Sequence, residues 1–438
     1  MKRTVALIAL AAVVSHTLAR TAFPILLPAI EDELLANHTQ AGLLTTVNFA
    51  SYLAGVAVVT AVSGRMEPIR LLQTGLASAI AGFVLLATAH GFTQLALGQA
   101  MTGIGSAGIW MSAPVLATSV VPGNRRGTVM GLLSSAMGLG IFIVSQGTNA
   151  MRLARDDDQT WRPTWVAAAI FALVVLVVIV GLIQTPPTAR ITGGVSLARL
   201  RTVPRSGALI VGFWVFGLIV ASFTPFLGAA LEEKGFSRTH VGNLYSLFGL
   251  AAAVGAVSLG RVSDRIGRQP VLLGAMGAIS AAALLVVAGR EPFATMAAVM
   301  YGIASFTFPV MIAAYLSDHL QDRAFSNALG ALTLIYGTAM AAGPYISGII
   351  GDSRFGFDVV FVGVAVLALI GAAAVFQLPR EPGAASVVVA GSGGGGTADY
   401  GGNGPEHHGP AGQLDEGEGL VVDEPGGPDG DDIHRQQV

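Results

Sequence analysis

Long apolar segments, separated by short polar breaks, fill the chain up to about residue 380. A segment of about 20 apolar residues is long enough to cross the hydrocarbon core of a bilayer as a helix. Other structures are excluded, because unpaired backbone groups are too costly in lipid and the alternating pattern of a membrane barrel is absent. The sequence therefore predicts an all-α membrane protein with twelve transmembrane helices, at about 4–30, 40–62, 70–89, 93–121, 127–148, 164–184, 207–230, 241–259, 270–288, 292–317, 326–350 and 358–378.

The composition excludes most other classes of protein. Charged residues make up 11% of the chain, whereas soluble proteins carry roughly 25%. The chain has no cysteine, which excludes disulfides, thiolate chemistry and cysteine-based metal sites. Its net charge of −2 provides no basic surface for nucleic acid. We expect no enzyme activity, cofactor or metal, because no phosphate-binding loop is present and Gly103-Ile104-Gly105 lies in an apolar segment without a preceding strand.

Lysine and arginine are unevenly distributed between the loops. If the N-terminus is inside, fifteen of them lie on the cytoplasmic side and seven on the outer side. Because cytoplasmic loops are enriched in these residues, we expect both termini in the cytoplasm and a multi-pass protein of the cell inner (cytoplasmic) membrane. Lys2 and Arg3 could open a signal peptide, but the apolar run continues to Ile30 without a cleavage site, so we expect a retained first span. The ratio of 22 Arg to 2 Lys is typical of a GC-rich prokaryotic genome.

The polar loops divide the chain into four parts. We expect an N-terminal six-helix half at residues 1–185, a cytoplasmic central loop at 186–206, a C-terminal six-helix half at 207–380 and a tail at 381–438. The tail has 16 glycines and ten acidic residues from Pro382 onward. Such a composition cannot bury enough apolar surface to offset the entropy of ordering, so we expect a disordered, Gly-rich acidic tail.

Two loops at equivalent positions of the two halves have similar sequences. They read GRMEPIR at residues 64–70 and GRVSDRIGR at residues 260–268, a weak internal repetition of the kind found in transporter halves. The twelve spans in two halves, together with the second loop, resemble the major facilitator superfamily. In that family the motif G-x-x-x-D-R-x-G-R follows the second span of each half. The first copy departs from that pattern, with Glu67 in place of Asp and no second glycine. The resemblance covers about residues 4–380 and implies a secondary transporter with alternating access.

The resemblance also implies a conformational latch between the halves. Asp264 would face the positive end of the fifth span, an arrangement worth roughly 0.3–2 kcal/mol. Alternatively, the arginines only fix the topology, but anchoring does not need Gly267 or the spacing of the turn. The latch residues are Gly260, Asp264, Arg265, Gly267 and Arg268, facing Arg125 and Arg126. Small residues at four-residue spacing let helices approach closely, and in the family the fifth and eleventh spans pack across the interface between the halves. General helix packing in membranes explains the spacing almost as well. The residues are Gly127, Gly131 and Ser135 in the fifth span, and Ala339, Gly343, Ser347 and Gly351, with Pro344, in the eleventh.

A charged residue lies deep in the first span. Arg20 stands within an apolar run, and charges at membrane depth are costly enough to indicate function. His16 is four residues earlier on the same helical face, and Pro24, which has no N–H for the carbonyl of Arg20, opens the backbone locally. The alternative is a structural arginine bonded to backbone carbonyls or bridged by water, but no carboxylate lies at depth to pair with it. We therefore predict an anion site at Arg20.

Other polar or aromatic residues at depth are candidates for the same pocket, although each one could equally serve packing. In the family, spans 1, 4, 7 and 10 line the cavity, and Gln99 stands where the family often has arginine, which disfavours multiply charged substrates. The candidates beside Arg20 and His16 are Asn48, Tyr52, Gln99, Trp110, Trp214, Tyr301 and Ser305. Together they predict an amphipathic pocket for a modest organic molecule.

The sequence thus predicts a secondary transporter of a small organic anion. His16, with an ordinary pKa of roughly 6.5, is the only titratable group at depth, so a coupling proton carried by His16 is one hypothesis; anion exchange and facilitated diffusion are the others. Efflux of a drug-like compound is the alternative transport function, although the Gly-Pro pair of drug antiporters is absent from span five. A sensor that signals through the tail, without transport, is the alternative from another class.

Overall fold

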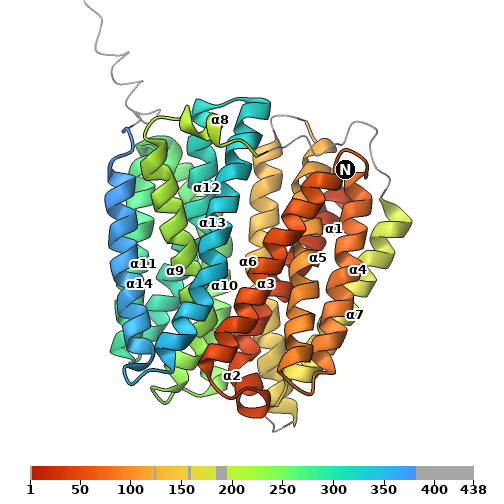
Figure 1. The fold of residues 1–438 in the computed structure, drawn as a ribbon, viewed down its shortest axis with the longest axis vertical. Helices are drawn as coiled ribbons and strands as arrows, with labels where there is room; N and C mark the ends of the chain where they lie inside the picture. Colours follow the sequence, from red (N-terminus) through yellow and green to blue (C-terminus); the bar gives the residue numbers. More distant parts are fainter. Residues whose placement is uncertain (1, 123–124, 156–158, 184–194, 381–438) are drawn as a thin grey trace, which may run out of the picture. The chain divides into compact units, whose positions relative to one another are not determined.

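The computed structural model describes residues 2–122, 125–155, 159–183 and 195–380. The predicted tail and most of the central loop lie outside these residues. Within them the structure is helical throughout, and the helices form one bundle (Figure 1). The elements are α1 (Lys2–Val13), η1 (Val14–Thr21), α2 (Ala22–Leu34), α3 (His38–Val62), α4 (Pro68–Ala87), α5 (Phe92–Ser119), α6 (Arg126–Arg155), α7 (Trp161–Leu182), α8 (Leu197–Arg201), α9 (Ser206–Glu232), α10 (Arg238–Ile266), α11 (Arg268–Ala288), α12 (Phe293–His319), α13 (Asp322–Gly351) and α14 (Gly356–Phe376).

The number of membrane spans agrees with the sequence. Among the described residues, eleven helices are long and apolar enough to cross a bilayer, and α1, η1 and α2 count together as the first of them. The remaining span, which brings the number to twelve, is α10. It bends by 43° between Arg238–Gly255 and Ser258–Ile266. The prediction of an all-α membrane protein with twelve spans is confirmed.

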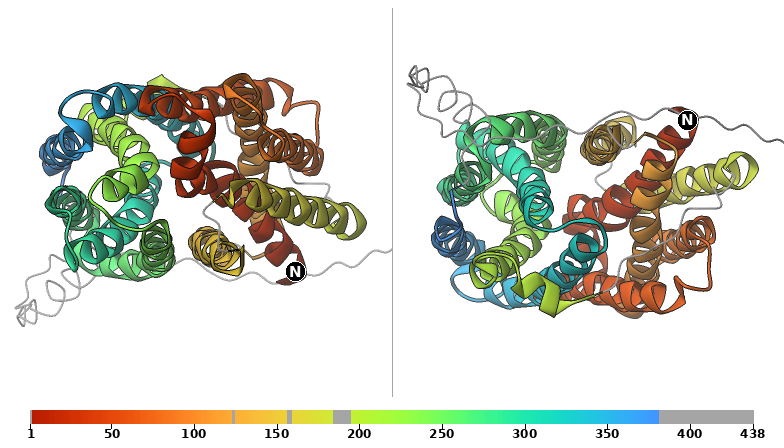
Figure 2. Two further views of the ribbon diagram at one scale, coloured as in Figure 1. Left: turned by 90° about the horizontal axis from the view of Figure 1, so that it is seen from below. Right: turned by 90° about the horizontal axis from the view of Figure 1, so that it is seen from above.

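Two groups of helices lie side by side, as seen along the bundle in Figure 2. In the first group α4 and α3 pack on α5, and α7 packs on α4; in the second α11 and α10 pack on α12, and α14 packs on α9 and α11. We call the end where α1 begins at Lys2 and α14 ends at Phe376 the terminus end. The opposite end, where α2 ends at Leu34 and α3 begins at His38, is the far end.

The groups meet mainly through two helix pairs, α6 with α10 and α3 with α13. The fifth and eleventh spans therefore do cross the interface, as the family resemblance implied. The closest approach of α6 is at Gly138, where an added Cβ would lie 2.6 Å from the carbonyl oxygen of Gly249. Gly127, by contrast, has nothing within 4 Å of an added Cβ. Ser135 of the predicted stripe lies one turn before Gly138 on the same face, and it donates a hydrogen bond of 3.2 Å to the carbonyl of Ala253 in α10. The predicted stripe of α6 therefore does face α10, while Gly127, at the start of the helix, lies beyond the close contact.

In α13 the small-residue stripe packs within its own group, which corrects the prediction. An added Cβ at Gly343 would lie 2.8 Å from the Cβ of Ala221 in α9, and Ser347 donates a hydrogen bond of 2.8 Å to Ser222 in α9. The contact with α3 uses Gly348 instead, whose added Cβ would collide with the carbonyl of His38. Regular spacing identified a helix with two packed faces but assigned the wrong neighbour to the stripe.

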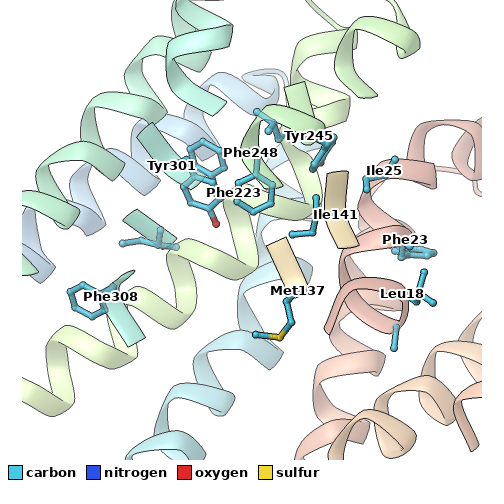
Figure 3. Close-up of a cluster of buried hydrophobic side chains, with 14 of the residues drawn as sticks. Leu18, Phe23, Ile25, Met137, Ile141, Phe223, Tyr245, Phe248, Tyr301 and Phe308 are labelled. Carbon is cyan, nitrogen blue, oxygen red and sulfur yellow. The ribbon is translucent and has the colours of Figure 1, made fainter. Parts of the chain in front are cut away.

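The buried core is continuous across the interface. Figure 3 shows aromatic rings of the second group near Met137 and Ile141 of α6, with Leu18, Phe23 and Ile25 of the first span beyond them. These rings belong to Phe223, Tyr245, Phe248, Tyr301 and Phe308, all fully or almost fully buried. The central helices are thus fixed on both sides by apolar packing, which limits the polar groups near the bundle centre to a few positions.

Candidate substrate-binding site

The first span is a π-helix where the charged residue lies. Over η1 the backbone bonds connect residues five apart, so that the N–H of Ala22 donates to the carbonyl of Thr17. Such π segments are rare and often occur at functional sites. Pro24, just beyond the segment, has no N–H to donate, as the sequence suggested. The wide turn and the missing donor leave carbonyls between residues 18 and 20 in need of other partners.

Asn48 of α3 supplies one of those partners. Its side-chain amide nitrogen lies 3.1 Å from the carbonyl oxygen of Ala19, 3.1 Å from that of Gln99 and 2.9 Å from the hydroxyl of Thr102. Asn48 is 3% exposed. Its donors are therefore used to join η1, α3 and α5. A role of Asn48 as a substrate ligand stays a prediction.

Further bonds fix η1 and determine which side chains remain free. Ser15 donates to the carbonyl of Ser106 at 3.1 Å, Ser106 donates back to the carbonyl of Ser15 at 3.0 Å, and Thr17 donates to the carbonyl of Met137 at 2.9 Å. Within η1 only His16 and Arg20 are not buried. The π segment thus presents these two side chains together, on the one face that the neighbouring helices do not cover.

Arg20 has no acceptor within the described residues. Its guanidinium carbon lies 3.9 Å from the ring centroid of Tyr52 and 5.6 Å from that of Phe49. Its Nε and Nη2 are buried without a hydrogen-bond partner, which leaves Nη1 as the nitrogen that a ligand can reach. A buried donor without an acceptor costs about 1–3 kcal/mol, and more for a charged group. The structural role considered for this arginine, bonding to backbone carbonyls, is not what the structure shows.

Aromatic rings from both groups surround His16. Its ring centroid lies 5.9 Å from that of Trp110 in α5 and 5.9 Å from that of Phe306 in α12. Among the described residues no hydrogen bond is formed by its ring nitrogens. Tyr336 of α13 lies within electrostatic range of both Arg20 and Tyr52. The site therefore joins η1, α3 and α5 of the first group to α12 and α13 of the second.

Sequence reasoning missed Phe49, Phe306 and Tyr336. Phe306 immediately follows the candidate Ser305, and Tyr336 is an aromatic residue in a helix otherwise rich in small side chains. Both signals are visible in the sequence. Neither shows that these rings face the first span, because that depends on how the two groups pack.

Two of the predicted residues, Tyr301 and Ser305, lie away from this site. Tyr301 is 1% exposed, stacks on Phe223 at 3.7 Å and shares a hydrogen bond of 2.8 Å with Thr224. Ser305 donates to the carbonyl of Gly302 in its own helix at 3.3 Å. Both are buried parts of the second group, and their polar atoms are occupied.

Trp214 lies elsewhere on α9. Its ring is 39% exposed and its Nε1 donates to the hydroxyl of Thr338 at 3.3 Å. Thr338 is two residues from Tyr336, which places it on about the opposite side of α13 from the site. Gln99 is beside Asn48 and 1% exposed, and its Nε2 is buried without a partner among the described residues. We therefore keep Arg20, His16, Tyr52 and Trp110 as candidates from the sequence.

The loop motif forms a compact network at the terminus end. Gly267 has a φ of +92°, a conformation that favours glycine, and it alone separates α10 from α11. Arg268 lies 2.6 Å from a carboxylate oxygen of Asp264 and 3.1 Å from one of Asp318 at the end of α12. Asp264 thus pairs within its own group here.

The other predicted latch residues make no contact that joins the groups in the described part of the chain. Gly260 has open space around an added Cβ, Arg265 and Arg125 are exposed, and the side chain of Arg126 lies outside the described part. The latch stays a prediction, for a conformation in which the terminus end is closed.

At the far end, by contrast, polar contacts connect the two groups. Asp352, after α13, accepts hydrogen bonds from the N–H of His38 at 2.9 Å, the N–H of Thr39 at 2.7 Å and the hydroxyl of Thr39. The carboxylate therefore caps the N-terminus of α3, where the helix dipole favours negative charge. Burial would raise the pKa of Asp352, but these hydrogen bonds hold it below its usual range.

A second set of contacts connects α6 and α2 to α10. Asn149 of α6 donates to the carbonyl of Thr239 at 3.0 Å, and Arg152 donates to the carbonyl of Arg238 at 3.0 Å. The side chain of Arg238 forms an ion pair with Asp32, which lies near the end of α2. In this conformation the far end is held closed by hydrogen bonds and an ion pair between the groups.

Comparison with known proteins places this geometry in a family. The sequence matches the family described as "Uncharacterised MFS-type transporter YbfB" over residues 12–377. The fold is similar to the crystal structure of a bacterial homolog of the human lysosomal transporter Spinster, with a TM-score of 0.68, 16% identity, and coverage of 86% of this chain and 96% of the other.

Individual relatives match smaller parts of the chain. The uncharacterized transporter YgaY of Escherichia coli O157:H7 is 30% identical over 160 residues, which are 36% of this chain and 39% of the relative, so the match spans about two fifths of that protein. A protein of Cupriavidus pinatubonensis named "Probable 4-methylmuconolactone transporter" is 22% identical over 57% of this chain and 60% of its own. The class H tetracycline resistance protein of Pasteurella multocida is 27% identical over 34% of this chain and 37% of its own. Since the family match covers most of the twelve-span body, the chain belongs to the major facilitator superfamily of transporters.

Proposed function

We propose that this protein is a secondary transporter that moves a small organic anion across the prokaryotic cytoplasmic membrane by alternating access. The observation that carries the proposal is the guanidinium of Arg20, which is buried at two of its three nitrogens and has no acceptor in the described residues. An anion that accepts from Nη1 would give this charged guanidinium an acceptor, through a charge-assisted hydrogen bond. No carboxylate of the protein does so in the described structure.

The position of Arg20 suits alternating access. It lies in η1, between the terminus end and the far end, and the surrounding rings come from both groups of helices. A ligand bound there contacts both groups, so its binding energy differs between conformations in which the groups are tilted differently. The far-end contacts would open, and the predicted Asp264 latch would close, when the site turns to the other side. We also propose that both termini are cytoplasmic, on the distribution of Lys and Arg.

The test is thermal stability of the detergent-purified protein with small carboxylates, neutral sugars and lipophilic cations. A ligand at 100 times its dissociation constant stabilises by roughly 2.7 kcal/mol. We expect carboxylates alone to raise the midpoint, and Arg20→Gln to abolish the increase. Arg354→Gln is the matched control, because Arg354 is exposed at the far end and contacts only the ring of Phe355 among the described residues.

The alternative is efflux of a drug-like compound. The similarity to a tetracycline resistance protein supports it, and so does the number of aromatic rings at the site. It predicts that lipophilic compounds raise the midpoint equally in wild type and Arg20→Gln. The relative named for 4-methylmuconolactone shows that similar sequences are also assigned to small metabolites.

Proton coupling through His16 stays a separate proposal. His16 is beside Arg20 on the uncovered face of η1, and protonation there would add a second positive charge near a bound anion. The measurement is anion uptake into vesicles with an imposed pH gradient. Uptake by His16→Gln that responds to the gradient as wild type does removes this proposal without affecting the role of Arg20.

A further inference from the structure

The side chains around Arg20 and His16 are almost all aromatic. Only 7% of the chain is aromatic, yet the rings recorded near these two residues come from four different helices. They are Phe49 and Tyr52 of α3, Trp110 of α5, Phe306 of α12 and Tyr336 of α13. Apolar packing alone would be served as well by Leu or Val, which dominate the spans elsewhere. The concentration of flat rings around a buried guanidinium that has no acceptor among the described residues indicates a flat ligand.

The polar atoms of these rings are also without partners in the described part of the chain. Among the described residues, no hydrogen bond is formed by the hydroxyls of Tyr52 and Tyr336 or by Nε1 of Trp110. Tyr52 is buried, and Trp110 and Tyr336 are half-buried. Two fully buried tyrosines of the second group do have partners. Tyr245 donates to the carbonyl of Thr224 at 2.7 Å, and the hydroxyl of Tyr301 forms a hydrogen bond with the hydroxyl of Thr224. The unpaired hydroxyls and indole N–H therefore provide donors around the carboxylate position that the protein itself does not use.

The stacking of Arg20 restricts the shape of an anion that binds to it. The guanidinium carbon lies 3.9 Å from the centroid of Tyr52, so that ring covers one face of the cation. The N–H bonds of a guanidinium lie in its plane, so a carboxylate that accepts from Nη1 lies close to that plane. When the carboxylate is conjugated to an aromatic ring, the ring continues that plane and stacks on neighbouring rings. A saturated ring is puckered and cannot do so.

The charge at the site limits the ligand to one negative group. Arg20 is the one arginine or lysine in the middle of a described span; the others lie at span ends or in loops. A second carboxylate or a phosphate would leave a charge without a partner in a desolvated site, which costs several kcal/mol. Gln99, a neutral residue, adds no charge nearby.

We propose that the substrate is a planar aromatic monocarboxylate, bound through Arg20 and stacked between the rings of α3 and α5 on one side and those of α12 and α13 on the other. This rests on the proposed function, because it assigns a substrate class to the same anion site. Aromatic pairs add about 0.5–1.5 kcal/mol beyond area burial, or up to about tenfold in affinity. The proposal therefore predicts a ratio of affinities between two acids of equal charge and similar size.

The experiment is calorimetric titration of the full-length protein in detergent with benzoate, cyclohexanecarboxylate and benzamide. We expect benzoate to bind several-fold to about tenfold more tightly than cyclohexanecarboxylate, and benzamide, which lacks the charge, to give no measurable binding. In Trp110→Leu and Phe306→Leu the ratio is expected to fall towards one while cyclohexanecarboxylate still binds. Trp214→Leu is the matched control, because that ring lies away from the site, and it is expected to keep the wild-type ratio.

The outcomes test the aromatic substrate class and the anion site separately. Equal binding of benzoate and cyclohexanecarboxylate to wild type, or tighter binding of the saturated acid, overturns the aromatic substrate class and leaves the anion transporter intact. Binding of benzamide as tight as that of benzoate, or no binding of either acid, overturns the anion site itself. The comparison in wild type decides both points even if the leucine variants do not fold.

Discussion

Removal of the Asp352 carboxylate tests whether the far-end contacts hold the conformation described here. Asp352 belongs to the second group and accepts three hydrogen bonds from His38 and Thr39 at the start of α3 in the first group. It is the carboxylate that caps this helix, so its loss weakens a contact that exists only while the far end is closed. We expect Asp352→Asn and Asp352→Ala to shift the population towards conformations with an open far end.

The magnitude follows from the geometry. Asparagine has one acceptor oxygen where aspartate has two. Asp352→Asn therefore loses the interaction of the charge with the helix dipole, about 0.3–1 kcal/mol, and also the bonds to one of the two oxygens, from either His38 or Thr39, about 0.5–1.5 kcal/mol. Because Asp352 is exposed, the lower part of each range applies, together about 0.8–1.5 kcal/mol, or roughly a fourfold to twelvefold change in the ratio of closed to open. Asp352→Ala loses the charge and the whole cap, the latter about 0.5–2 kcal/mol, and the combined change is roughly fourfold to ninetyfold. The pair of Arg238 with Asp32 remains, so opening stays partial.

The assay is the distance between spin labels on the two groups. The chain has no cysteine, so Thr93→Cys in α5 and Arg290→Cys before α12 can be labelled without background. Both positions are exposed at the far end. Asp358→Ala is the matched control, because Asp358 is an exposed carboxylate at the same end that pairs with Lys234 of its own group at 2.6 Å.

The expected result is a longer-distance population that grows from wild type through Asp352→Asn to Asp352→Ala and is unchanged in Asp358→Ala. Identical distributions in wild type and Asp352→Ala would refute the reasoning. The pKa of Asp352 is held down in the closed state, so its contribution is complete above the ordinary carboxyl pKa of roughly 3.9 and is lost as the pH falls through the lowered value. The pKa of His38 is raised, first by its hydrogen bond with Glu31 and also by the charge of Asp352. The difference between wild type and Asp352→Asn is therefore expected to persist from about pH 7.5 to about pH 5, and to grow within that range as His38 becomes protonated beside the carboxylate.

Three substitutions test the packing and the backbone, each by the midpoint of thermal unfolding in detergent. Gly138→Ala is expected to lower the midpoint, because its Cβ would lie 2.6 Å from the carbonyl oxygen of Gly249, whereas Gly127→Ala, with nothing within 4 Å, is expected to leave it unchanged; equal effects would contradict the assigned interface. Gly267→Ala is expected to cost about 1–3 kcal/mol, since its φ is +92°, and an unchanged midpoint would show that the turn is not required. Asn48→Ala is expected to lower stability by about 1–3 kcal/mol while anion affinity is kept; loss of binding in a stable variant would restore Asn48 as a ligand.

The membrane fold could be predicted from the sequence because its signal is local. The length of each apolar run fixes a span, and a single charge such as Arg20 in such a run is conspicuous without any knowledge of packing. His16 followed from helical spacing, which holds in the π segment as well. The turn at Gly267 was recognised because only glycine adopts its conformation easily. These features depend on a few neighbouring residues.

The remaining features depend on which helices meet. The sequence does not show that the side-chain nitrogen of Asn48 has three acceptors in α5 and η1. It also does not show which face of α9 is covered, and for this reason Trp214 was assigned to the pocket. Phe306 and Tyr336 lie about 290 to 320 residues from His16 and Arg20 in sequence. Their part in the site is a consequence of the contact between the two groups, which no local pattern contains.

Each end of the bundle has a carboxylate at a helix end, but only the carboxylate at the far end contacts the other group of helices. At the far end the carboxylate of Asp352 caps a helix of the other group, and at the terminus end the carboxylate of Asp264 pairs with Arg268 of its own group. Closing the terminus end through the predicted latch would exchange that local pair for the start of α6. Each contact is worth only about 1 kcal/mol, so the exchange is nearly balanced, and a ligand at Arg20 that interacts differently with the two conformations can determine which end is open.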